Sequence, residues 1–212
     1  MIQFHLSKKL AKDMKMHVQS KSKINPQAMQ WYANVVTLAR RKCVIAMELQ
    51  SRYTMVFCGM TKKEFEHFPE IFQERLWREV LVLCTEEENE EFLNKLSNQI
   101  LSIANEQRYQ EGHDRSVTSH MNQVVQSLEI YVQYQGNDLP ESSAAAYEFG
   151  VRENKIIRKR KSDKDYFRPA EVFRDFWLGL LDFTENGSGP GGPTNKDLES
   201  NNIIYVNFDK KE

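Results

Sequence analysis

Residues 30–60 constrain the fold of this chain more than any other stretch, because they are the densest in β-branched and aromatic side chains. Three apolar runs, at about residues 31–39, 43–49 and 53–57, are separated by polar breaks of hairpin length. The pattern therefore predicts a three-stranded antiparallel meander, with the rest of the chain built over it.

Side chains alternate between the two faces of a strand, which divides the residues of the meander into two sets. If Leu38 lies opposite Cys43 and Leu49 lies opposite Tyr53, one face is apolar except for Asn34. The other face is mixed, so we expect it to be only partly covered. The apolar face would carry Tyr32, Asn34, Val36, Leu38, Cys43, Ile45, Met47, Leu49, Tyr53, Met55 and Phe57.

The segments around the meander carry helical periodicity and two further strand candidates. The strongest amphipathic pattern is expected to cover the apolar face of the meander. Together these features predict an α+β fold, in which an antiparallel sheet built on the central meander is covered on one face by amphipathic helices. Helices are expected at about residues 8–15, 68–83, 86–100, 117–131, 142–151 and 169–181, and short strands at 2–6 and 101–104.

The 212 residues suit one domain followed by a tail. We expect a single α+β domain over residues 1–183 and a Gly/Pro-rich linker over 184–200. Residues 201–212 contain a last strand candidate and the tail. That strand can pair with the edge of its own sheet or with a neighbouring copy, so a homo-oligomer or another protein partner is one expectation.

Composition narrows the classes of function. A net charge of −1 removes any whole-molecule attraction to nucleic acid or membranes, so only local patches remain. No window approaches the roughly 20 apolar residues of a membrane span, and the N-terminus lacks the apolar core of a signal peptide. The three cysteines have no metal-ligand spacing, so we expect reduced core thiols in a cytoplasmic protein without metal or cofactor.

Basic residues gather in two places. Residues 152–168 contain eight basic and three acidic residues, and clustered Lys and Arg are what phosphate-backbone binding requires. The alternative is a solvated basic loop. The candidate residues for binding anions or nucleic acid are Arg40, Arg41 and Lys42 at the hairpin tip, with Arg158, Lys159, Arg160 and Lys161.

Arg115 lies at the expected start of a helix, where the free N–H groups and the guanidinium both favour an anion. Asn34 needs a partner on a buried face, and Asn122 and Arg115 are candidates to supply it. These residues, with Trp31, form a candidate polar pocket at one end of the sheet. The alternative is a purely structural hydrogen-bond network or a helix-cap ion pair.

Histidines give no catalytic assignment. His113 and His120 are seven residues apart, which matches neither the i, i+4 metal spacing nor HExxH. Nothing near them supplies a nucleophile in a recognisable motif. We therefore assign no catalytic residue and no metal ligand.

The motifs WYAN at residues 31–34, RRKC at 40–43, RSV at 115–117 with MN at 121–122, and the Pro-led helix at 169 resemble a small bacterial family catalogued only as a domain of unknown function. The resemblance spans roughly residues 2–181. It implies that these motifs belong to one fold, and it implies no activity. The family often has histidine where this chain has Tyr32 and a small residue where it has His120, so a role for a histidine at the first position does not carry over.

Three classes of function follow from the sequence. The first is a cytoplasmic binding or interaction module without catalysis. The second is a nucleic-acid-associated protein, in a mobile-element or defence setting, that uses the two basic groups. The third is an enzyme on a small anionic substrate around Arg115.

Overall fold

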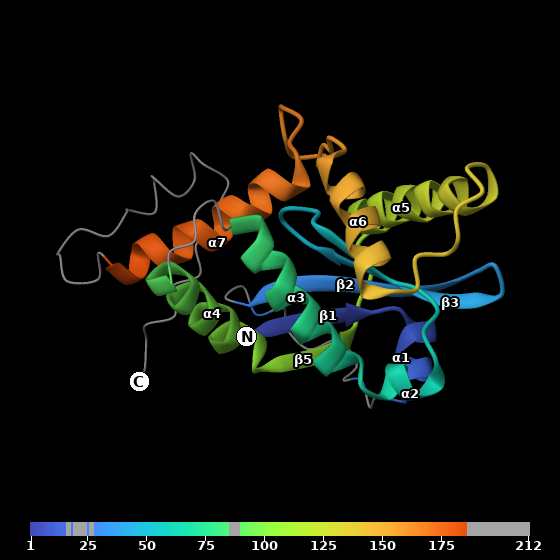
Figure 1. The fold of residues 1–212 in the computed structure, drawn as a ribbon, viewed down its shortest axis with the longest axis horizontal. Helices are drawn as coiled ribbons and strands as arrows, with labels where there is room; N and C mark the ends of the chain where they lie inside the picture. Colours follow the sequence, from blue (N-terminus) through green and yellow to red (C-terminus); the bar gives the residue numbers. More distant parts are fainter. Residues whose placement is uncertain (16–17, 19–24, 26–27, 85–89, 186–212) are drawn as a thin grey trace.

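The structure, a computed structural model, describes residues 1–15, 18, 25, 28–84 and 90–185. The elements follow one another from β1 at the N-terminus to α7 (Figure 1). They are β1 (Ile2–Leu6), α1 (Lys8–Met14), β2 (Met29–Leu38), β3 (Arg41–Glu48), β4 (Thr54–Phe57), α2 (Lys62–Glu66), α3 (Phe68–Cys84), α4 (Glu90–Ala104), β5 (Gln107–Glu111), α5 (Arg115–Gln133), α6 (Ser143–Lys155) and α7 (Pro169–Glu185).

The strands form one five-stranded sheet in the order β4-β3-β2-β1-β5. The predicted meander is present, since β2 pairs antiparallel with β3 and β3 with β4. The expectation of a purely antiparallel sheet is wrong, because β1 pairs parallel with both β2 and β5. Parallel neighbours need a crossover connection, and α1 lies in the connection between β1 and β2.

β5 lies in a segment for which the sequence predicts no strand. The expected strand at residues 101–104 is instead the last turn of α4, and the strand is Gln107–Glu111. Its sequence, QRYQE, lacks the β-branched residues typical of a strand. β5 is at the edge of the sheet and only Gln110 in it is buried, so apolar density gives no signal there.

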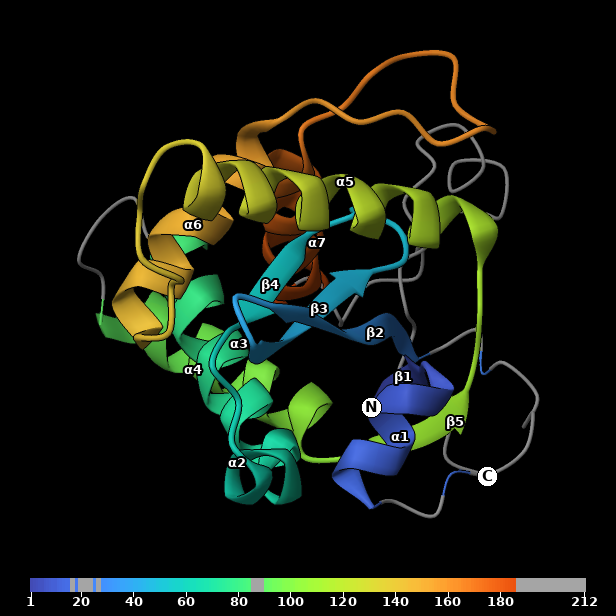
Figure 2. The ribbon, with the colours of Figure 1, turned by 90° about the vertical axis from the view of Figure 1, so that its right-hand side faces the viewer.

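Helices cover both faces of the sheet (Figure 2). We name these the α3 face, on which α1, α2, α3, α4 and α7 pack, and the α5 face, on which α5 and α6 pack. The prediction of helices on one face is therefore wrong. Trp31 and Val44, on the side where the sequence predicted partial cover, belong to the core beneath α3, whereas Tyr32 and Ile45 belong to the core beneath α5.

The β3–β4 turn explains part of this difference. The ladder pairs Met47 with Thr54, and the Glu48 amide donates to the Tyr53 carbonyl at 2.8 Å, which leaves residues 49–52 as the loop. The predicted pairing of Leu49 with Tyr53 is shifted by one residue. A shift of one residue exchanges the two faces of a strand, so Tyr53, Met55 and Phe57 point to the α3 face.

The β2–β3 turn is formed by Ala39 and Arg40, which both have positive φ, 46° and 63°. Leu38 pairs with Arg41 on either side of it, so this is a two-residue hairpin loop in which both residues are left-handed. Asn-Gly is the preferred sequence for such a loop, because glycine adopts positive φ without steric cost.

The β4 edge of the sheet is closed by a side chain. The Asn154 amide of α6 accepts a hydrogen bond from the Thr54 amide at 2.8 Å and donates one to the Thr54 carbonyl at 2.9 Å. Asn154 is 1% exposed and Thr54 is fully buried. Asn154 therefore takes the place of one residue of a sixth strand.

Among the helices that the structure describes, none has the length and apolarity needed to cross a membrane. The predicted linker and terminal strand at residues 184–212 lie outside the described residues, except that residues 184–185 complete α7. The acidic run that was expected to start α4 also lies largely outside them.

Replacing Asn154 with Ala is expected to lower the free energy of unfolding by about 1 to 3 kcal/mol, because both backbone groups of Thr54 would lose their buried partner. Urea unfolding followed by circular dichroism measures this change. Lys155→Ala, at an exposed position on the same helix, is the matched control and should change stability little. Equal effects of the two substitutions would contradict the edge-closing role of Asn154.

Arg40→Gly is expected to raise the free energy of unfolding by roughly 0.5 to 1 kcal/mol, because glycine removes the steric cost of a left-handed residue, partly offset by its entropy. Thermal and urea unfolding are the measurements. Thr37→Gly, at an exposed site in the strand, should destabilise by a similar amount. A loss of stability with Arg40→Gly would refute the strain at this turn.

Candidate functional site

The α5 face divides into an apolar half over β3 and β4 and a polar half over β1, β5 and the start of β2. We call the polar half the polar cluster. All its members are buried, with exposures of 8% or less. They are Gln3 and His5 from β1, Gln30 and Tyr32 from β2, and Gln110 from β5.

Hydrogen bonds join these side chains to one another. His5 Nε2 lies 2.6 Å from Gln30 Oε1, and the Gln110 amide nitrogen lies 3.0 Å from His5 Nδ1. The Gln30 amide donates to Gln3 Oε1 at 3.0 Å, and the His5 ring stacks on Tyr32 at 4.3 Å. These partners fit a neutral imidazole protonated on Nε2, in agreement with burial, which lowers the pKa of His5.

Gly112 allows the loop after β5 to pass close to His5. A Cβ atom at this position would lie 2.4 Å from His5 Nδ1, which is too close for any side chain. The chain then enters α5 through Asp114, whose carboxylate caps the helix by accepting from the Val117 amide at 2.8 Å. The start of α5 is thereby fixed beside the polar cluster.

The β3–β4 turn is organised by a buried carboxylate. Glu48 Oε2 accepts hydrogen bonds from the Gln50 amide at 2.9 Å, the Ser51 amide at 2.6 Å and the Ser51 hydroxyl at 2.7 Å. Burial raises the pKa of Glu48, and these three donors oppose that rise. The turn is therefore rigid, and it ends in Arg52.

Arg52 is the most unusual residue of this region. It has a positive φ of 59°, although it is not glycine, and its side chain is 4% exposed. Its guanidinium donates to His120 Nδ1 at 3.2 Å, to the Ser116 hydroxyl at 3.2 Å and to the Leu49 carbonyl. Three of the five N–H groups of a guanidinium are thus used, and all three acceptors are neutral.

Within the part of the chain that the structure describes, Arg52 forms no ion pair with a carboxylate. Burial lowers the pKa of Arg52, while the charges of Glu48 and Asp114 raise it from a greater distance. A buried cation without a direct anionic partner is costly, because desolvation is not repaid by a close opposite charge.

A shallow, open depression of about 500 Å³ lies over Arg52. It is bounded by the β3–β4 turn, the start of α5 and the loop between α6 and α7. We call it the Arg52 depression. Its lining consists of Leu49, Gln50, Arg52, Asp114, Ser116, Arg160, Lys161 and Ser162.

Asp114 connects the Arg52 depression to the polar cluster. Burial lowers the pKa of His5 and of Arg52, and the negative charge of Asp114 opposes both changes. Burial raises the pKa of Tyr32, and Asp114 adds to that rise. Asp114 therefore lies near all three residues. The two polar regions are therefore neighbours on the α5 face, with the first turn of α5 between them.

The loop between α6 and α7 is held against this site by two arginines. Arg158 is 3% exposed, forms an ion pair with Glu153 at 3.6 Å and donates to the His120 carbonyl at 3.3 Å. Arg160 pairs with Asp163 at 2.6 Å and donates to the carbonyl and the side chain of Gln50 at 2.9 and 3.0 Å. Arg160 therefore fastens the loop to the β3–β4 turn, and Arg158 fastens it to α5.

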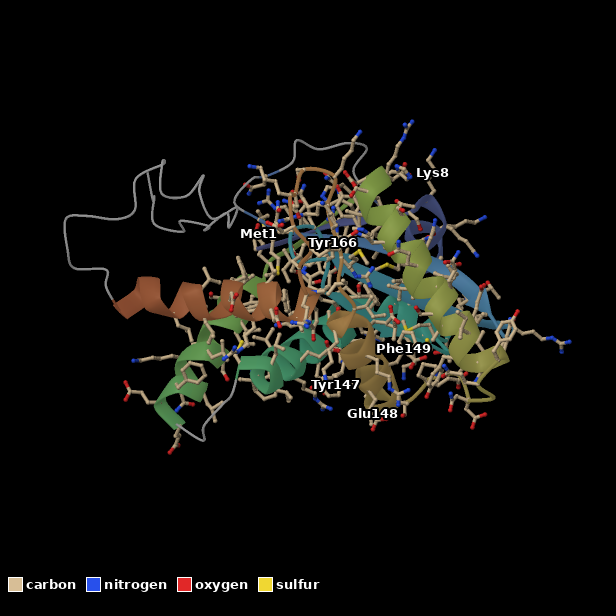
Figure 3. All side chains as sticks on the ribbon, turned by 90° about the horizontal axis from the view of Figure 1, so that it is seen from above. Met1, Lys8, Tyr147, Glu148, Phe149 and Tyr166 are labelled. Atoms are coloured by element: carbon tan, nitrogen blue, oxygen red, sulfur yellow. The ribbon has the colours of Figure 1, made fainter. Side chains whose placement is uncertain are left out.

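The outer side of the same loop is exposed. Tyr166 is 66% exposed, is labelled in Figure 3, and carries Lys159 over its ring at 5.4 Å. Lys161 is also exposed, and it is a basic side chain that both lines the Arg52 depression and reaches solvent.

The four residues of the predicted polar pocket are not gathered in one place. Trp31 is fully buried on the α3 face, against Phe72 at 5.0 Å, whereas Asn34 is half-buried on the opposite face. Arg115 and Asn122 are both exposed on α5. Trp31 and Asn34 diverge because they are three positions apart in a strand of period two. The neighbours of Arg115, Asp114 and Ser116, line the depression instead.

The two predicted basic groups are at opposite ends of β3. Arg41 at the hairpin tip forms a two-bond ion pair with Glu141, at 2.8 and 3.1 Å, and Lys42 pairs with Asp13 at 2.7 Å. Arg160 contacts the turn at the other end, and the eight residues of β3 separate the ends by roughly 23 Å. Of the seven residues, Arg40, Lys159 and Lys161 are exposed and have no ion pair among the described residues.

Sequence reasoning missed Arg52 and the polar cluster. Arg52 was part of a polar break and had no distinguishing neighbour. The cluster did leave a signal, because Gln3 and His5 alternate with Ile2, Phe4 and Leu6 in β1, as Gln30 and Tyr32 alternate with Trp31 in β2. In a sheet buried on both faces, such polar positions indicate a shared internal network.

Metal binding has no support among the described residues, in which no three His, Cys, Asp or Glu side chains gather around a common point. His120, which lies beside the lining residue Arg52, accepts a hydrogen bond from it on one ring nitrogen. Burial, and then the charges of Arg52 and Arg158, lower its pKa to about 4. His120 is therefore neutral near pH 7.

The free energy of unfolding is expected to fall as the pH is lowered from about 6.5 to about 4, because the unfolded chain protonates His120 in this range and the folded protein does not. The loss due to His120 should be about 1 to 3 kcal/mol. His120→Asn keeps an acceptor near Nδ1 for Arg52 and removes the titration, so its stability should depend less on pH. Urea unfolding across this pH range measures both proteins, and parallel curves would contradict the expectation. Burial also lowers the pKa of His5, but His5 is present in both proteins and so contributes equally to both curves.

The chain was compared with protein families and with curated proteins. No curated protein matches the chain. A family model described as a domain of unknown function (DUF6933) matches residues 3–172, which include β1 to β5, the Arg52 depression and the first residues of α7. The expected resemblance to an uncharacterised domain family is thereby confirmed, and the chain belongs to the DUF6933 family.

Proposed function

We propose that this protein is a binding module for a small ligand that carries an oxyanion, such as a phosphate or carboxylate group, and that the anion binds in the Arg52 depression. The observation that carries the proposal is the buried guanidinium of Arg52, which has three neutral acceptors and no ion pair among the described residues. An oxyanion above it would supply the missing charge and accept its remaining N–H groups.

The other residues of the depression suit the same ligand. Lys161 adds a mobile positive charge at the rim, and the Ser116 and Ser162 hydroxyls can donate to anion oxygens. Ser116 also lies in the first turn of α5, where the helix dipole favours negative charge. Asp114 is the acidic residue of this lining, and it would repel a ligand that presents only anionic groups. It would therefore favour a ligand that also presents a hydrogen-bond donor beside its oxyanion.

Binding is better supported than catalysis. The hydroxyl of Ser116 accepts a hydrogen bond from Arg52, which stabilises it as an acceptor and does not activate it as a nucleophile. His120 already accepts from Arg52 through Nδ1. The enzyme alternative, centred on Arg115, has the further weakness that Arg115 is exposed and its two neighbours line the depression.

The nucleic-acid alternative has less support than a small ligand. Arg41, Lys42, Arg158 and Arg160 are each paired with a carboxylate of this chain. The exposed residues that remain are split between the two ends of β3, so they do not form one continuous basic stripe.

Inorganic phosphate and pyrophosphate, titrated at constant ionic strength with chloride as the reference anion, should bind saturably in calorimetry and raise the melting temperature. Lys161→Ala should weaken that binding roughly two- to fivefold, the usual effect of losing one charge at an exposed site. Arg52→Gln should abolish it. Circular dichroism at the titration temperature verifies that each variant is folded.

Lys164→Ala is the matched control, because Lys164 is an exposed lysine of the same loop and does not line the depression. It should leave binding unchanged. Equal weakening by Lys161→Ala and Lys164→Ala would indicate general attraction to a basic loop and would refute the site. Failure of phosphate, pyrophosphate and a dicarboxylate to bind would refute the proposal itself.

A further inference from the structure

Cys43 and Cys58 are cross-strand neighbours at the open end of the β3–β4 hairpin. The ladder ends with Val44 opposite Phe57, and Cys43 and Cys58 are the next residues of the two segments, just before the register shifts by one residue where the Met60 amide donates to the Lys42 carbonyl. Both side chains belong to the core of the α5 face, with exposures of 0% and 7%. Each thiol is the largest influence on the pKa of the other, which places the two close together.

This placement satisfies the geometric requirement for a disulfide. Directly opposed residues in an antiparallel pair have Cα atoms about 4.5 to 5.5 Å apart. Disulfides span Cα separations of about 4.4 to 6.8 Å. The two thiols can therefore be joined with little movement of the backbone, whereas Cys84 is buried on the α3 face, across the sheet from them.

The surroundings also favour the reactive form of one thiol. The nearby Cys58 thiol lowers the pKa of Cys43 and the Gly59 amide acts in the same direction, against burial, whereas Cys43 and burial raise the pKa of Cys58. Glu141 lies directly over Gly59, at 2.6 Å from the position of a Cβ, and is fixed there by Arg41. The pair is thus buried, but it is adjacent to the exposed ion pair of Arg41 and Glu141.

We infer that Cys43 and Cys58 form a reversible intramolecular disulfide, with a low-molecular-weight disulfide such as oxidised glutathione as the oxidant. One cysteine thiolate attacks a glutathione sulfur and releases one glutathione thiolate. The second cysteine thiolate then attacks the cysteine sulfur of the mixed disulfide and releases the other. The two cysteines lose two electrons and two protons, and the oxidant becomes two glutathione thiols.

The bond would act on the hairpin that carries Arg52. It would close the open end of the β3–β4 pair, opposite the turn that Glu48 organises. Cross-linking the chain at residues 43 and 58 restricts the unfolded state and so stabilises the folded one. This inference does not depend on the proposed ligand.

Peptide mapping of the unmodified full chain tests the inference directly. The reduced protein is incubated with oxidised glutathione, its free thiols are alkylated, and it is digested with trypsin without reduction. Cleavage after Lys42, Arg52 and Lys62 places the two cysteines in separate peptides, residues 43–52 and 53–62. We expect these peptides to be recovered as one disulfide-linked species. The melting temperature should rise by roughly 5 to 10 °C and return on addition of dithiothreitol.

Two variants complete the experiment. Cys84→Ser should still yield the linked peptides, and Cys58→Ser should lose them and the reversible rise in melting temperature. Three outcomes would each overturn the inference. They are the recovery of glutathione adducts alone, a disulfide link that includes Cys84, and three alkylated thiols after oxidation. Because the decisive map uses the unmodified chain, a poorly folded variant does not affect it.

Discussion

Burial of β2 on both faces is the constraint on which the rest of the structure depends. β2 is the central strand of the sheet, with α3 and α7 side chains packed on one face and α5 on the other. A polar side chain buried on this strand is therefore costly unless it finds a partner inside the protein. Gln30 does so with Gln3, His5 and two backbone carbonyls. The polar cluster thus occupies the part of the α5 face where the parallel strands β1 and β5 extend the sheet beyond the apolar meander.

The same constraint makes Arg52 stand out. The buried polar groups of the cluster are hydrogen-bonded to one another, apart from Gln110 Oε1, which has no partner among the described residues. The buried carboxylate of Glu48 is surrounded by donors from its own turn. Arg52 is held by neutral acceptors, in a strained backbone conformation, at the floor of an open depression. Strain and an uncompensated charge persist only where the surrounding structure maintains them, and such positions are concentrated at functional sites. This is why the depression, and not the cluster, is the site that we assign.

How much the sequence predicted depended on whether the deciding interaction was local. The helices at Phe68–Cys84 and Pro169–Glu185 were predicted correctly, because their apolar periodicity and capping lie within the element itself. The meander was also correct. The parallel placement of β1 and β5 was not, because it depends on pairing between distant segments. The one-residue shift of β4 came from a four-residue loop ending in left-handed Arg52, and nothing in the apolar pattern distinguishes that loop from one of three residues.

The site followed the same division. The sequence predicted an anion site at the start of α5 and assigned it to Arg115. Arg115 is exposed, and its neighbours Asp114 and Ser116 line the depression instead. The other lining residues come from the turn that contains Arg52 and from the loop that contains Arg160. These two segments are more than a hundred residues apart, so no local sequence pattern connects them. β3 joins the two regions of interest. The turn at one of its ends contains Arg52, and Cys43 lies near its other end, beside Cys58. A short strand paired on both sides keeps its two ends in a fixed relation, so the cysteine pair and the turn that presents Arg52 belong to one rigid hairpin.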